Sequence, residues 1–476
     1  MSLLSSLSSS SDALSAFDRA IAITQNNVTN ASTPGYATQR AILDAQPFDL
    51  PAGLSGGVSA GVPQSTRNVF AEAAVDRAQT SLGTASQQAA SLGAVQSALG
   101  LSDTGGIPAT LGNLFSSFSA WSQNPTSVAG RQAVVDSAQR TADSFRTTVV
   151  NLQQVRQDTE TQISQQVDQI NGYAQQLQTY NVQVRAGDRN DAGLDAKIYA
   201  TVESLSQLAN ITTSVQSDGT VTVLLGGQTP LVIGDQQYNI SRSISAPSGQ
   251  AVPPSAAILD ASGRDVTAQV TGGQLGALLQ THNQVLASLL GDATQPGSLN
   301  RLAQAVADRV NALLTAGTVS DGPPAVSGGA LFSYDTSNVT NVAASLAMDP
   351  SMTPDQLAAI DPGPPYVSNG TALKLAGLAN PQNSADQIDN ISYVQFFGNA
   401  AADVGRRLSA ATDQQAVQQQ VVTQAQTVRQ QISGVSLDEQ AALLVEYQRT
   451  YQANAQFFVV LNSITQTAVN LLGAVA

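Results

Sequence analysis

The amino-acid sequence predicts a mainly α fold with a β-containing insertion, which makes it an α+β chain of several domains. Three stretches of the sequence support this prediction. Apolar residues recur at heptad spacing near both termini and again over residues 135–184, as they do in long helices that pack along narrow seams. From about residue 211, β-branched residues alternate with polar ones, which favours strands. We therefore expect long helices from both chain ends to form a coiled-coil-like bundle, with an outer β-rich domain from the middle of the chain.

The first helix is predicted from heptad positions 3, 7, 10, 14, 17, 21, 24 and 28. Six of these eight positions are apolar, and the other faces carry Ser, Ala, Asn and Gln. The helix is followed by an Asn-rich stop and then by the run Thr33-Pro34-Gly35-Tyr36. Proline followed by glycine suits positions i+1 and i+2 of a type II turn. Residues 1–36 are therefore interpreted as a terminal assembly helix and its turn.

The longest seam lies in residues 37–210, which we interpret as the first part of a helical domain. Twelve of the fifteen seam positions between 135 and 184 are apolar. Pro125 is interpreted as the first residue of one continuous helix, and Gly187 as its stop. At about 1.5 Å per residue that helix would reach roughly 90 Å, which is a rod far longer than one globular core requires.

The middle of the chain changes character at residue 211. The runs ITTSVQ and TVTVLL flank Asp218-Gly219, a pattern that predicts two strands joined by a two-residue type I′ turn. Further strand-like runs follow, and one of them turns at Ser262-Gly263. We therefore expect an outer β-rich domain over 211–275. A helical segment over 276–318 and an outer irregular or β segment over 319–387 follow it.

The chain returns to helix for its last part. Residues 388–436, with a Gln-rich run at 412–433, are expected to complete the helical domain, and residues 437–476 to form a C-terminal assembly helix. Gly434 breaks the chain between the two helices. Ser436 and Glu439 have the spacing of a capping box. Eight of the eleven seam positions from Leu437 to Leu472 fit the heptad pattern.

The charge content excludes several classes of function. Only 11% of the residues are charged, against about a quarter in a typical protein. The net charge is -14, and Lys197 and Lys374 are the only lysines. Without clustered Lys and Arg, we expect no nucleic-acid binding. The sequence has no run of about 18 apolar residues, so we expect no membrane insertion. The first residues also lack the basic region of a Sec signal.

The reactive side chains are equally sparse. The chain has no cysteine and one histidine, which excludes disulfides, thiol chemistry and Cys/His zinc sites. His282, in a predicted helix, is interpreted as a satisfied core or surface residue. The acidic run from Asp188 has the wrong residues for a calcium loop at Ala192 and Tyr199, so it is interpreted as a polar turn. We therefore expect no catalytic residue, no metal and no cofactor.

The position of the two terminal seams suggests assembly. A single apolar stripe usually means ordinary core packing. Two narrow seams at the extreme ends of a chain, however, have no local neighbour to cover them, and terminal segments are normally the least ordered. Either the two ends pair with each other, or another molecule completes them, in which case they order on binding.

Two motifs resemble a known family. The segment Asn27 to Tyr36 resembles the N-terminal signature of the bacterial flagellar axial proteins, the rod, hook and hook-associated family. Residues 433–458, with the core YQRTYQAN from Tyr447 to Asn454, are similar to the C-terminal end of the hook-associated members. Gln440 stands where that family often has an acidic residue. The β-rich region and residues 319–387 carry little family signal.

The resemblance implies a structural adaptor at the flagellar hook–filament junction. It implies a homo-oligomeric ring between the hook protein and a second junction protein, hook-associated protein 3. It also implies export by the flagellar type III system, an extracellular location, a cytoplasmic export chaperone at the C-terminal helix and no enzyme activity. Two alternatives stay open, a hook or rod subunit of the same family and a secreted enzyme on an axial scaffold. The enzyme would need a catalytic group within 211–387.

The low charge content has a meaning under this interpretation. Faces of Ala, Gln, Ser and Asn beside an apolar seam can be buried against a neighbouring subunit without stranding charges. The candidate interface residues lie on the two terminal seams and in the turn; they are Leu7, Leu14, Phe17, Ile21, Val28, Asn30, Thr33, Pro34, Gly35, Tyr36, Leu437, Leu444, Tyr447, Tyr451, Asn454, Phe458 and Leu461.

Overall fold

The computed structural model describes residues 3–49, 54–100, 106–246, 252–320, 322 and 324–473. The side chains of the seam residues Leu3 and Leu472, and the last three residues of the expected C-terminal helix, lie outside the described part. The chain divides into two compact units. Unit 1 comprises residues 1–81, 170–239 and 418–476, and unit 2 comprises residues 82–169 and 240–417. The predicted mainly α fold with strands in the middle of the chain is confirmed.

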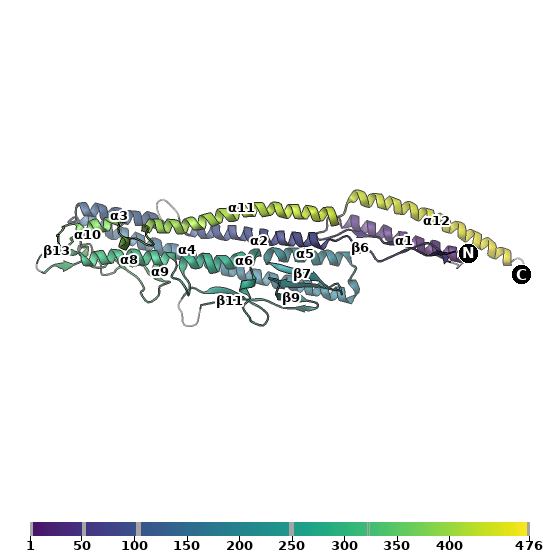
Figure 1. Ribbon diagram of the computed structural model, residues 1–476, viewed down its shortest axis with the longest axis horizontal. Coiled ribbons are helices and arrows are strands. Elements are labelled where there is room, and N and C mark those ends of the chain that lie inside the picture. Colours follow the sequence, from purple (N-terminus) through teal and green to yellow (C-terminus); the bar gives the residue numbers. More distant parts are fainter. Residues whose placement is uncertain are drawn as a thin grey trace. The chain divides into compact units, whose positions relative to one another are not determined.

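The two terminal helices of unit 1 pack against each other. Helix α1 (Leu3–Thr29) and helix α12 (Leu437–Gly473) lie side by side and run antiparallel (Figure 1). The rings of Phe17 and Tyr447 lie 6.4 Å apart between their centroids. Asn27, near the end of α1, contacts Gln440, near the start of α12. The chain ends therefore cover each other at least in part.

A narrow β ribbon follows α1, where the sequence predicted helical structure. Its strands pair antiparallel, the first with the last and so on inward; they are β1 (Gln39–Arg40), β2 (Leu43–Ala45), β3 (Phe48–Asp49), β4 (Leu54–Ser55), β5 (Val58–Ala60) and β6 (Gln64–Ser65). The ribbon folds back along α1, and the Ser9 hydroxyl donates to the carbonyl of Gly56 at 2.8 Å. The strands are only two or three residues long, which explains why periodicity did not reveal them.

Long helices form the framework of both units. These helices are α2 (Val69–Ala98), α3 (Ile107–Gln123), α4 (Val128–Gln183), α5 (Ala192–Leu208) and α11 (Tyr393–Ser433). Pro125 is not the first residue of α4, contrary to the prediction. It follows the end of α3, and its carbonyl accepts from Trp121 and Arg131. The Ser127 hydroxyl instead accepts from the Gly130 amide.

The buried stripe of α4 follows the predicted seam and then departs from it. The seam positions from Val135 to Leu152 are buried apolar residues. Beyond Ile163, the predicted positions Ile170, Leu177 and Val184 stay buried. Val167, Ala174 and Asn181 are buried as well, whereas the expected Tyr173 and Tyr180 are half-buried. The helix ends in a π-helical segment, η1 (Val184–Asp188), where Gly187 has a φ of 126°. The predicted stop at Gly187 is therefore correct.

A four-stranded antiparallel sheet completes unit 1. Its order is β10-β9-β8-β7, with β7 (Ile211–Val215), β8 (Val221–Leu225), β9 (Thr229–Ile233) and β10 (Gln236–Gln237). The predicted hairpin at Gly219 exists. The Gln216 amide donates to the Thr220 carbonyl, so the loop between these two residues has three residues, 217–219, and not the predicted two. The buried amide of Asn181 in α4 bonds to Val221 and Gly234. This side chain attaches the sheet to the helix.

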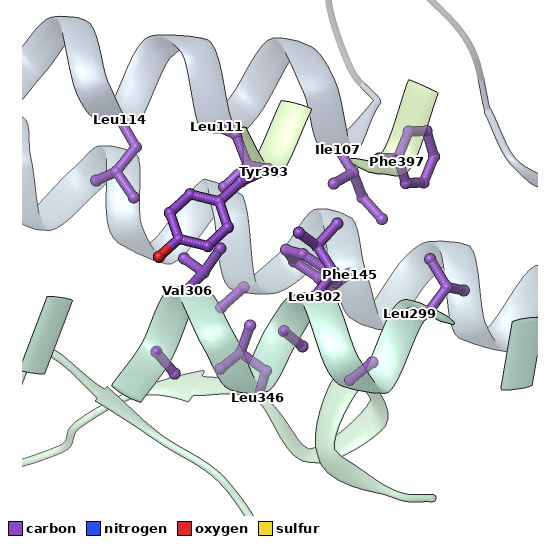
Figure 2. Close-up of a cluster of buried hydrophobic side chains, with 14 of the residues drawn as sticks. Ile107, Leu111, Leu114, Phe145, Leu299, Leu302, Val306, Leu346, Tyr393 and Phe397 are labelled. Atoms are coloured by element: carbon purple, nitrogen blue, oxygen red, sulfur yellow. The ribbon is translucent and has the colours of Figure 1, made fainter. Parts of the chain in front are cut away.

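Unit 2 has the larger hydrophobic core. Its other helical segments are α6 (Gly273–Gln280), the π-helical η3 (Thr281–Leu286), α7 (Ala287–Leu290), α8 (Ser298–Ala316), α9 (Val342–Ser345) and α10 (Gly370–Gly377). Figure 2 shows side chains from α3, α4, α8 and α11 meeting in this core, among them Leu111, Phe145, Leu302 and Tyr393. These side chains are fully buried or nearly so. Burial of each is worth about 1.5–3 kcal/mol, so this core is the main source of stability in unit 2.

The strands of unit 2 are short and form separate pairs. β11 (Ser241–Ser245) pairs with β12 (Ser255–Leu259), β13 (Thr318–Ser320) with β14 (Val326–Ser327), and β15 (Phe332–Ser333) with β16 (Ala347–Met348). The turn at Ser262-Gly263 after β12 is present, with a Gly263 φ of 80°. Single 3₁₀ turns, η2 (Thr267–Gln269), η4 (Pro354–Gln356) and η5 (Ser384–Asp386), lie between these elements.

The two units differ from the domain boundaries expected from the sequence. Residues 211–239 belong to unit 1 and residues 240–275 to unit 2, so 211–275 do not form one compact domain. The reason lies in which helix each β element contacts. Asn181 of α4 binds the four-stranded sheet, whereas Asn283 of η3 binds β12 through the backbone of Ala256.

Candidate assembly site at the chain ends

The buried face of α1 consists of small and polar residues. The buried stripe shares only Ser10 and Thr24 with the predicted seam positions; it consists of Ser10, Ala13, Ala16, Ala20, Thr24 and Asn27. The predicted residues Leu7, Leu14, Phe17 and Ile21 flank this stripe and are half-buried. Val28, expected on the seam, is exposed. Small side chains let neighbouring backbones approach closely, so they occupy the innermost positions while the larger residues lie at the edges.

On α12 the predicted seam faces inward but is only partly covered. Leu461 is buried, and Leu444, Tyr447, Asn454 and Phe458 are half-buried. Leu437 and Tyr451 are exposed. The Glu439 amide donates to the Ser436 hydroxyl at 3.4 Å, which is one half of the predicted capping box.

Asn27 connects the helices, the turn and the β ribbon. Its Nδ2 donates to Gln440 Oε1 and to the Gln39 carbonyl, both at 2.8 Å. Its Oδ1 accepts from the Gln39 amide and from the Tyr36 hydroxyl, both at 2.9 Å. Asn27 and Gln440 are almost completely buried. The position that departs from the family pattern, Gln440, therefore has a matched polar partner.

The turn after α1 has the predicted type II geometry. The Tyr36 amide donates to the Thr33 carbonyl at 3.1 Å, and Gly35 has a φ of 75°. Asn30 accepts from the Thr33 hydroxyl at 3.1 Å. A Cβ atom on Gly35 would lie 2.3 Å from the carbonyl oxygen of Ala196 in α5. Glycine is needed here for its positive φ and for the close approach of α5.

Arg67 ties this turn to two helices of unit 1. Its Nη2 donates to the Gly35 carbonyl at 2.6 Å and to Asp195 at 2.7 Å, and its Nη1 donates to Glu72 at 2.5 Å. The guanidinium carbon lies 3.9 Å from the centre of the Tyr199 ring. The side chains of Arg67 and Glu72 are each 6% exposed. A planar guanidinium can make these contacts at the same time.

Arg429 of α11 extends the cluster to a third helix. Its Nη1 donates to Glu203 at 2.7 Å and to Glu72 at 3.1 Å. Gln79 and Gln426 also donate to Glu203, at 3.0 and 3.1 Å. Desolvation raises the pKa of Glu203, but these bonds outweigh it and hold the pKa below its usual value. The cluster therefore fastens α2, α5 and α11 beside the turn.

The carboxylates of this cluster outnumber its two arginines. Burial, together with the charges of Glu72 and Glu203, raises the pKa of Asp76 to about 7. Burial raises the pKa of Asp195 as well, against the opposing effect of Arg67. Burial and the charge of Asp195 raise the pKa of Tyr199 to about 12. Sequence reasoning missed the cluster because its members are scattered between residues 67 and 429.

The outer face of α12 is unusually apolar for an exposed surface. Large apolar side chains outside the seam that are 47–65% exposed lie along the helix; they are Val445, Phe457, Val459, Val460, Ile464 and Val469. Leu461 is the single buried apolar residue among the α12 side chains that the structure describes. Extended apolar surface on a protein marks a site of interaction with another molecule.

A polar groove of about 960 Å³ lies where α11 meets α12. Thr38 of the turn segment, Arg40 of β1, and Gln430 and Glu439 of the two helices line it. The Thr38 hydroxyl donates to the Gly434 carbonyl at 2.8 Å, and the Ser433 hydroxyl donates to the Thr66 carbonyl at 3.1 Å. These bonds hold the α11–α12 junction against the ends of the ribbon.

The remaining sequence candidates have structural roles. Asp191, in the polar turn, accepts from the Leu194 amide and begins α5, and Asp195 pairs with Arg67. His282 is buried with polar partners. Within the described ranges, no group of three or more His, Cys, Asp or Glu residues could hold a metal ion. None of the described helices is both long and apolar enough to span a membrane.

Three family models match different parts of the chain. Residues 92–332 match the family described as "Flagellar hook-associated protein FlgK helical domain". Residues 7–36 match "Flagella basal body rod protein", and residues 426–471 match "Flagellar basal body rod FlgEFG protein C-terminal". The two shorter matches cover most of α1 with its turn and most of α12. They coincide with the candidate assembly residues.

Full-length relatives agree with these models. The chain is 24% identical to flagellar hook-associated protein 1 of Escherichia coli (strain K12), over 96% of this chain and 98% of that protein. It is 21% identical to the protein of the same name in Bacillus subtilis (strain 168), over 97% of each chain. The solved structure of the flagellar hook junction protein FlgK from Burkholderia pseudomallei matches with a TM-score of 0.60 and 17% identity. That match covers 76% of this chain and 100% of the other, and it shows a shared fold.

Proposed function

This chain belongs to the family of the flagellar hook-associated protein FlgK, and on that premise we propose that it is a structural adaptor between the flagellar hook and filament. In this role it forms a ring, with the hook protein on one side and hook-associated protein 3 on the other. A hook or rod subunit is the alternative within the axial proteins. The match over 92–332 favours the hook-associated role, because the rod models match only the chain ends.

The exposed apolar face of α12 is the observation that carries this proposal. An isolated subunit exposes large side chains such as Phe457, Val460 and Ile464 to water. Burying such a side chain contributes about 1.5–3 kcal/mol, so a row of them supports association with neighbouring copies. The half-buried seam of α12 supports the same interpretation. In the assembled ring, these residues would face neighbouring subunits.

The proposal also includes export of the subunit from the cell. We propose that the subunit passes through the flagellar type III channel and becomes part of the extracellular flagellum. A chain without cysteine carries no disulfide that could block passage in an unfolded state. Before export, a cytoplasmic chaperone would cover the apolar face of α12 and prevent premature association.

The test replaces the apolar face without disturbing the fold. The triple variant Phe457→Ser, Val460→Ser, Ile464→Ser removes exposed side chains, so we expect the helical circular dichroism and the melting temperature of the monomer to stay within error of the parent. We expect the variant to fail to restore filaments in a strain that lacks its own hook-associated protein 1. The matched control is Gln452→Ser, Gln456→Ser, Gln466→Ser, which changes exposed polar positions on the same helix.

The location of the protein gives the second measurement. Gold labelling of purified flagella distinguishes the hook shaft, the junction and the tip. Label at the junction supports the adaptor role, and label along the hook shaft would contradict it. Normal filament formation by the triple variant would contradict the role of α12.

The enzyme alternative has a separate assay. We propose that the chain has no catalytic activity, because its relatives bear the names of structural flagellar proteins and residues 211–387 offered no catalytic constellation in the sequence. A peptidoglycan hydrolase assay with purified protein is expected to give no turnover. Turnover that survives purification to homogeneity would contradict this part of the proposal.

A further inference from the structure

Strand β7 is an open edge of the four-stranded sheet in unit 1. Among the strands that the structure describes, it pairs only with β8. The Gln216 amide, directly after β7, donates to the Thr220 carbonyl, so these two residues form a hydrogen-bonded pair. Such pairs recur at every second residue of an antiparallel ladder. The amides and carbonyls of Ile211, Thr213 and Val215 therefore point away from β8.

This edge has none of the usual protection. In the described ranges, the amides of Ile211, Thr213 and Val215 have no hydrogen-bond partner. Natural edge strands are shielded by proline, by charged side chains or by a covering element. The β7 sequence, ITTSV, contains neither a proline nor a charge. It can therefore accept another strand, as in peptide recognition by β-strand addition.

A pocket of about 280 Å³ lies beside this edge, wholly within unit 1. Its apolar walls come from Val69 of α2, Ile198 and Val202 of α5, and Val215 of β7. Val69 and Val215 are each more than half exposed, so the pocket is open to solvent. Sites for small molecules usually have volumes of roughly 300–1,000 Å³. This pocket is smaller and suits a single side chain better than a cofactor.

Asp76 of α2 is the carboxyl group of the pocket that has no partner. It forms no hydrogen bond or ion pair with any described residue. Glu72, which also lines the pocket, is already paired with Arg67 and Arg429. Burial, together with the charge of Glu72, raises the pKa of Asp76 to about 7, and the nearby arginines oppose this shift only in part. A positive group in the pocket would stabilise the ionised form of Asp76.

A strand added at β7 would direct one of its side chains toward this pocket. Residues that lie directly opposite each other on antiparallel strands have their side chains on the same face of the sheet. Val215 and Val221 form such a pair, and both line the pocket together with Thr213. A residue opposite Thr213 therefore lies on the pocket side. A long side chain with an apolar stem and a positive end matches both the apolar walls and Asp76.

We propose that β7 and this pocket bind an extended peptide segment of a partner protein, which adds a strand at β7 and directs one lysine or arginine side chain toward Asp76. The unpaired amides of β7 account for the extended backbone, and the unpaired carboxyl accounts for the positive side chain. The surface shares no residue with the exposed face of α12. The proposal therefore does not rest on the proposed role in the flagellum.

The test uses full-length protein and two fluorescein-labelled, capped pentapeptides. One is Thr-Val-Lys-Val-Thr, and the matched control has the uncharged residue norleucine in place of lysine. At about pH 8, where the Asp76 carboxyl is ionised, we expect the lysine peptide to bind saturably and at least about fivefold more tightly than the control. Fluorescence anisotropy measures both affinities.

Hydrogen exchange followed by mass spectrometry locates the bound peptide. The amides of Ile211, Thr213 and Val215 should exchange more slowly in the presence of the lysine peptide, because they gain hydrogen-bond partners. The amides of β10, at the opposite edge of the same sheet, serve as the internal control and should not change.

Three variants separate the contribution of the charge from that of the strand. Asp76→Asn should weaken the lysine peptide at least about fivefold and leave the norleucine peptide unchanged. Asp188→Asn changes an exposed carboxyl of unit 1 and should alter neither affinity. Val215→Pro removes an outward amide, which an edge strand tolerates, and should weaken both peptides about two- to tenfold. Circular dichroism reports whether each variant is folded.

Several results would overturn the proposal. Equal affinities of the parent for the two peptides, or of the parent and folded Asp76→Asn for the lysine peptide, would exclude the role of the charge. Binding without slower exchange in β7 would exclude strand addition. Slower exchange in β7 that grows with protein concentration in the absence of peptide would assign the edge to a second copy of this chain and not to a partner protein.

Discussion

At the residue scale, Asp76 makes the stability of unit 1 depend on pH. Its pKa is about 7 in the folded protein, above the usual value for aspartate, chiefly because of burial. Between about pH 4 and 7, the folded state therefore keeps a proton that the unfolded state has already lost. Stability falls as the pH rises through this window, and the full cost is present above pH 7.

Replacing Asp76 removes this dependence. When the pH rises from about 5.5 to about 8.5, we expect the free energy of unfolding of the parent to fall by about 1–2 kcal/mol relative to that of Asp76→Asn. Urea unfolding of unit 1, followed by circular dichroism at both pH values, measures this difference. The control Asp168→Asn changes an exposed carboxyl of unit 2. An equal pH dependence in the parent and Asp76→Asn would refute the assignment.

Gly35 is a second residue whose role can be isolated. Gly35→Ala adds a Cβ at a positive φ and 2.3 Å from the Ala196 carbonyl oxygen, so we expect a loss of about 2–4 kcal/mol in unfolding free energy. Gly172→Ala is the matched control, because nothing lies within 4 Å of its added Cβ in α4. That change should stabilise by up to about 1 kcal/mol. Thermal unfolding of both variants gives the comparison, and a neutral Gly35→Ala would show that the turn adapts.

At the element scale, Asn27 couples α1 to α12. Asn27→Ala leaves Gln440, Gln39 and Tyr36 without their shared partner, which we expect to cost about 1–3 kcal/mol. In a double-mutant cycle with Gln440→Ala, the coupling energy should be about 0.5–3 kcal/mol. Faster hydrogen exchange in α1 of the single variant would locate the loss. A coupling energy of zero would mean that the contact contributes no stability.

Sequence periodicity predicted the long helices well, and it failed where packing decided the face. The stop at Gly187 and the turn at Gly35 follow from local backbone chemistry, so the sequence revealed them. The buried stripe of α1 did not follow from hydrophobicity, because alanines lie innermost where the backbones approach most closely. The ribbon of residues 39–65 has strands of two or three residues, too short for a periodic signal.

The candidate site was predictable only in part. The turn residues and the α12 seam were named from the sequence and lie together in unit 1. Arg67, Glu72, Glu203 and Arg429 were not named, because charges separated by hundreds of residues meet only through tertiary folding. The exposed apolar residues of α12 were also not apparent from the sequence, because this helix carries apolar residues both on the seam and outside it.

At the scale of the whole molecule, the two units are stabilised by different interactions. Unit 2 contains the large hydrophobic core of Figure 2, whereas unit 1 depends on the cluster around Arg67. The only tryptophan, Trp121, is fully buried in unit 2. Its emission therefore reports the unfolding of unit 2 alone, whereas the helical circular dichroism reports both units. Multidomain chains often depart from a single unfolding transition, so the two signals can be compared directly.

We expect the two signals to separate when each unit is weakened in turn. Leu111→Ala should lower the urea midpoint of Trp121 emission, because truncating a buried leucine costs about 2–5 kcal/mol. Arg67→Gln should lower the first phase of the helical signal and leave the Trp121 midpoint unchanged, because it strands Asp195 and leaves Glu72 with Arg429 alone, at a cost of about 3–5 kcal/mol in unit 1. If both variants shift both signals equally, the two units unfold as one cooperative body, because some helices contribute residues to both.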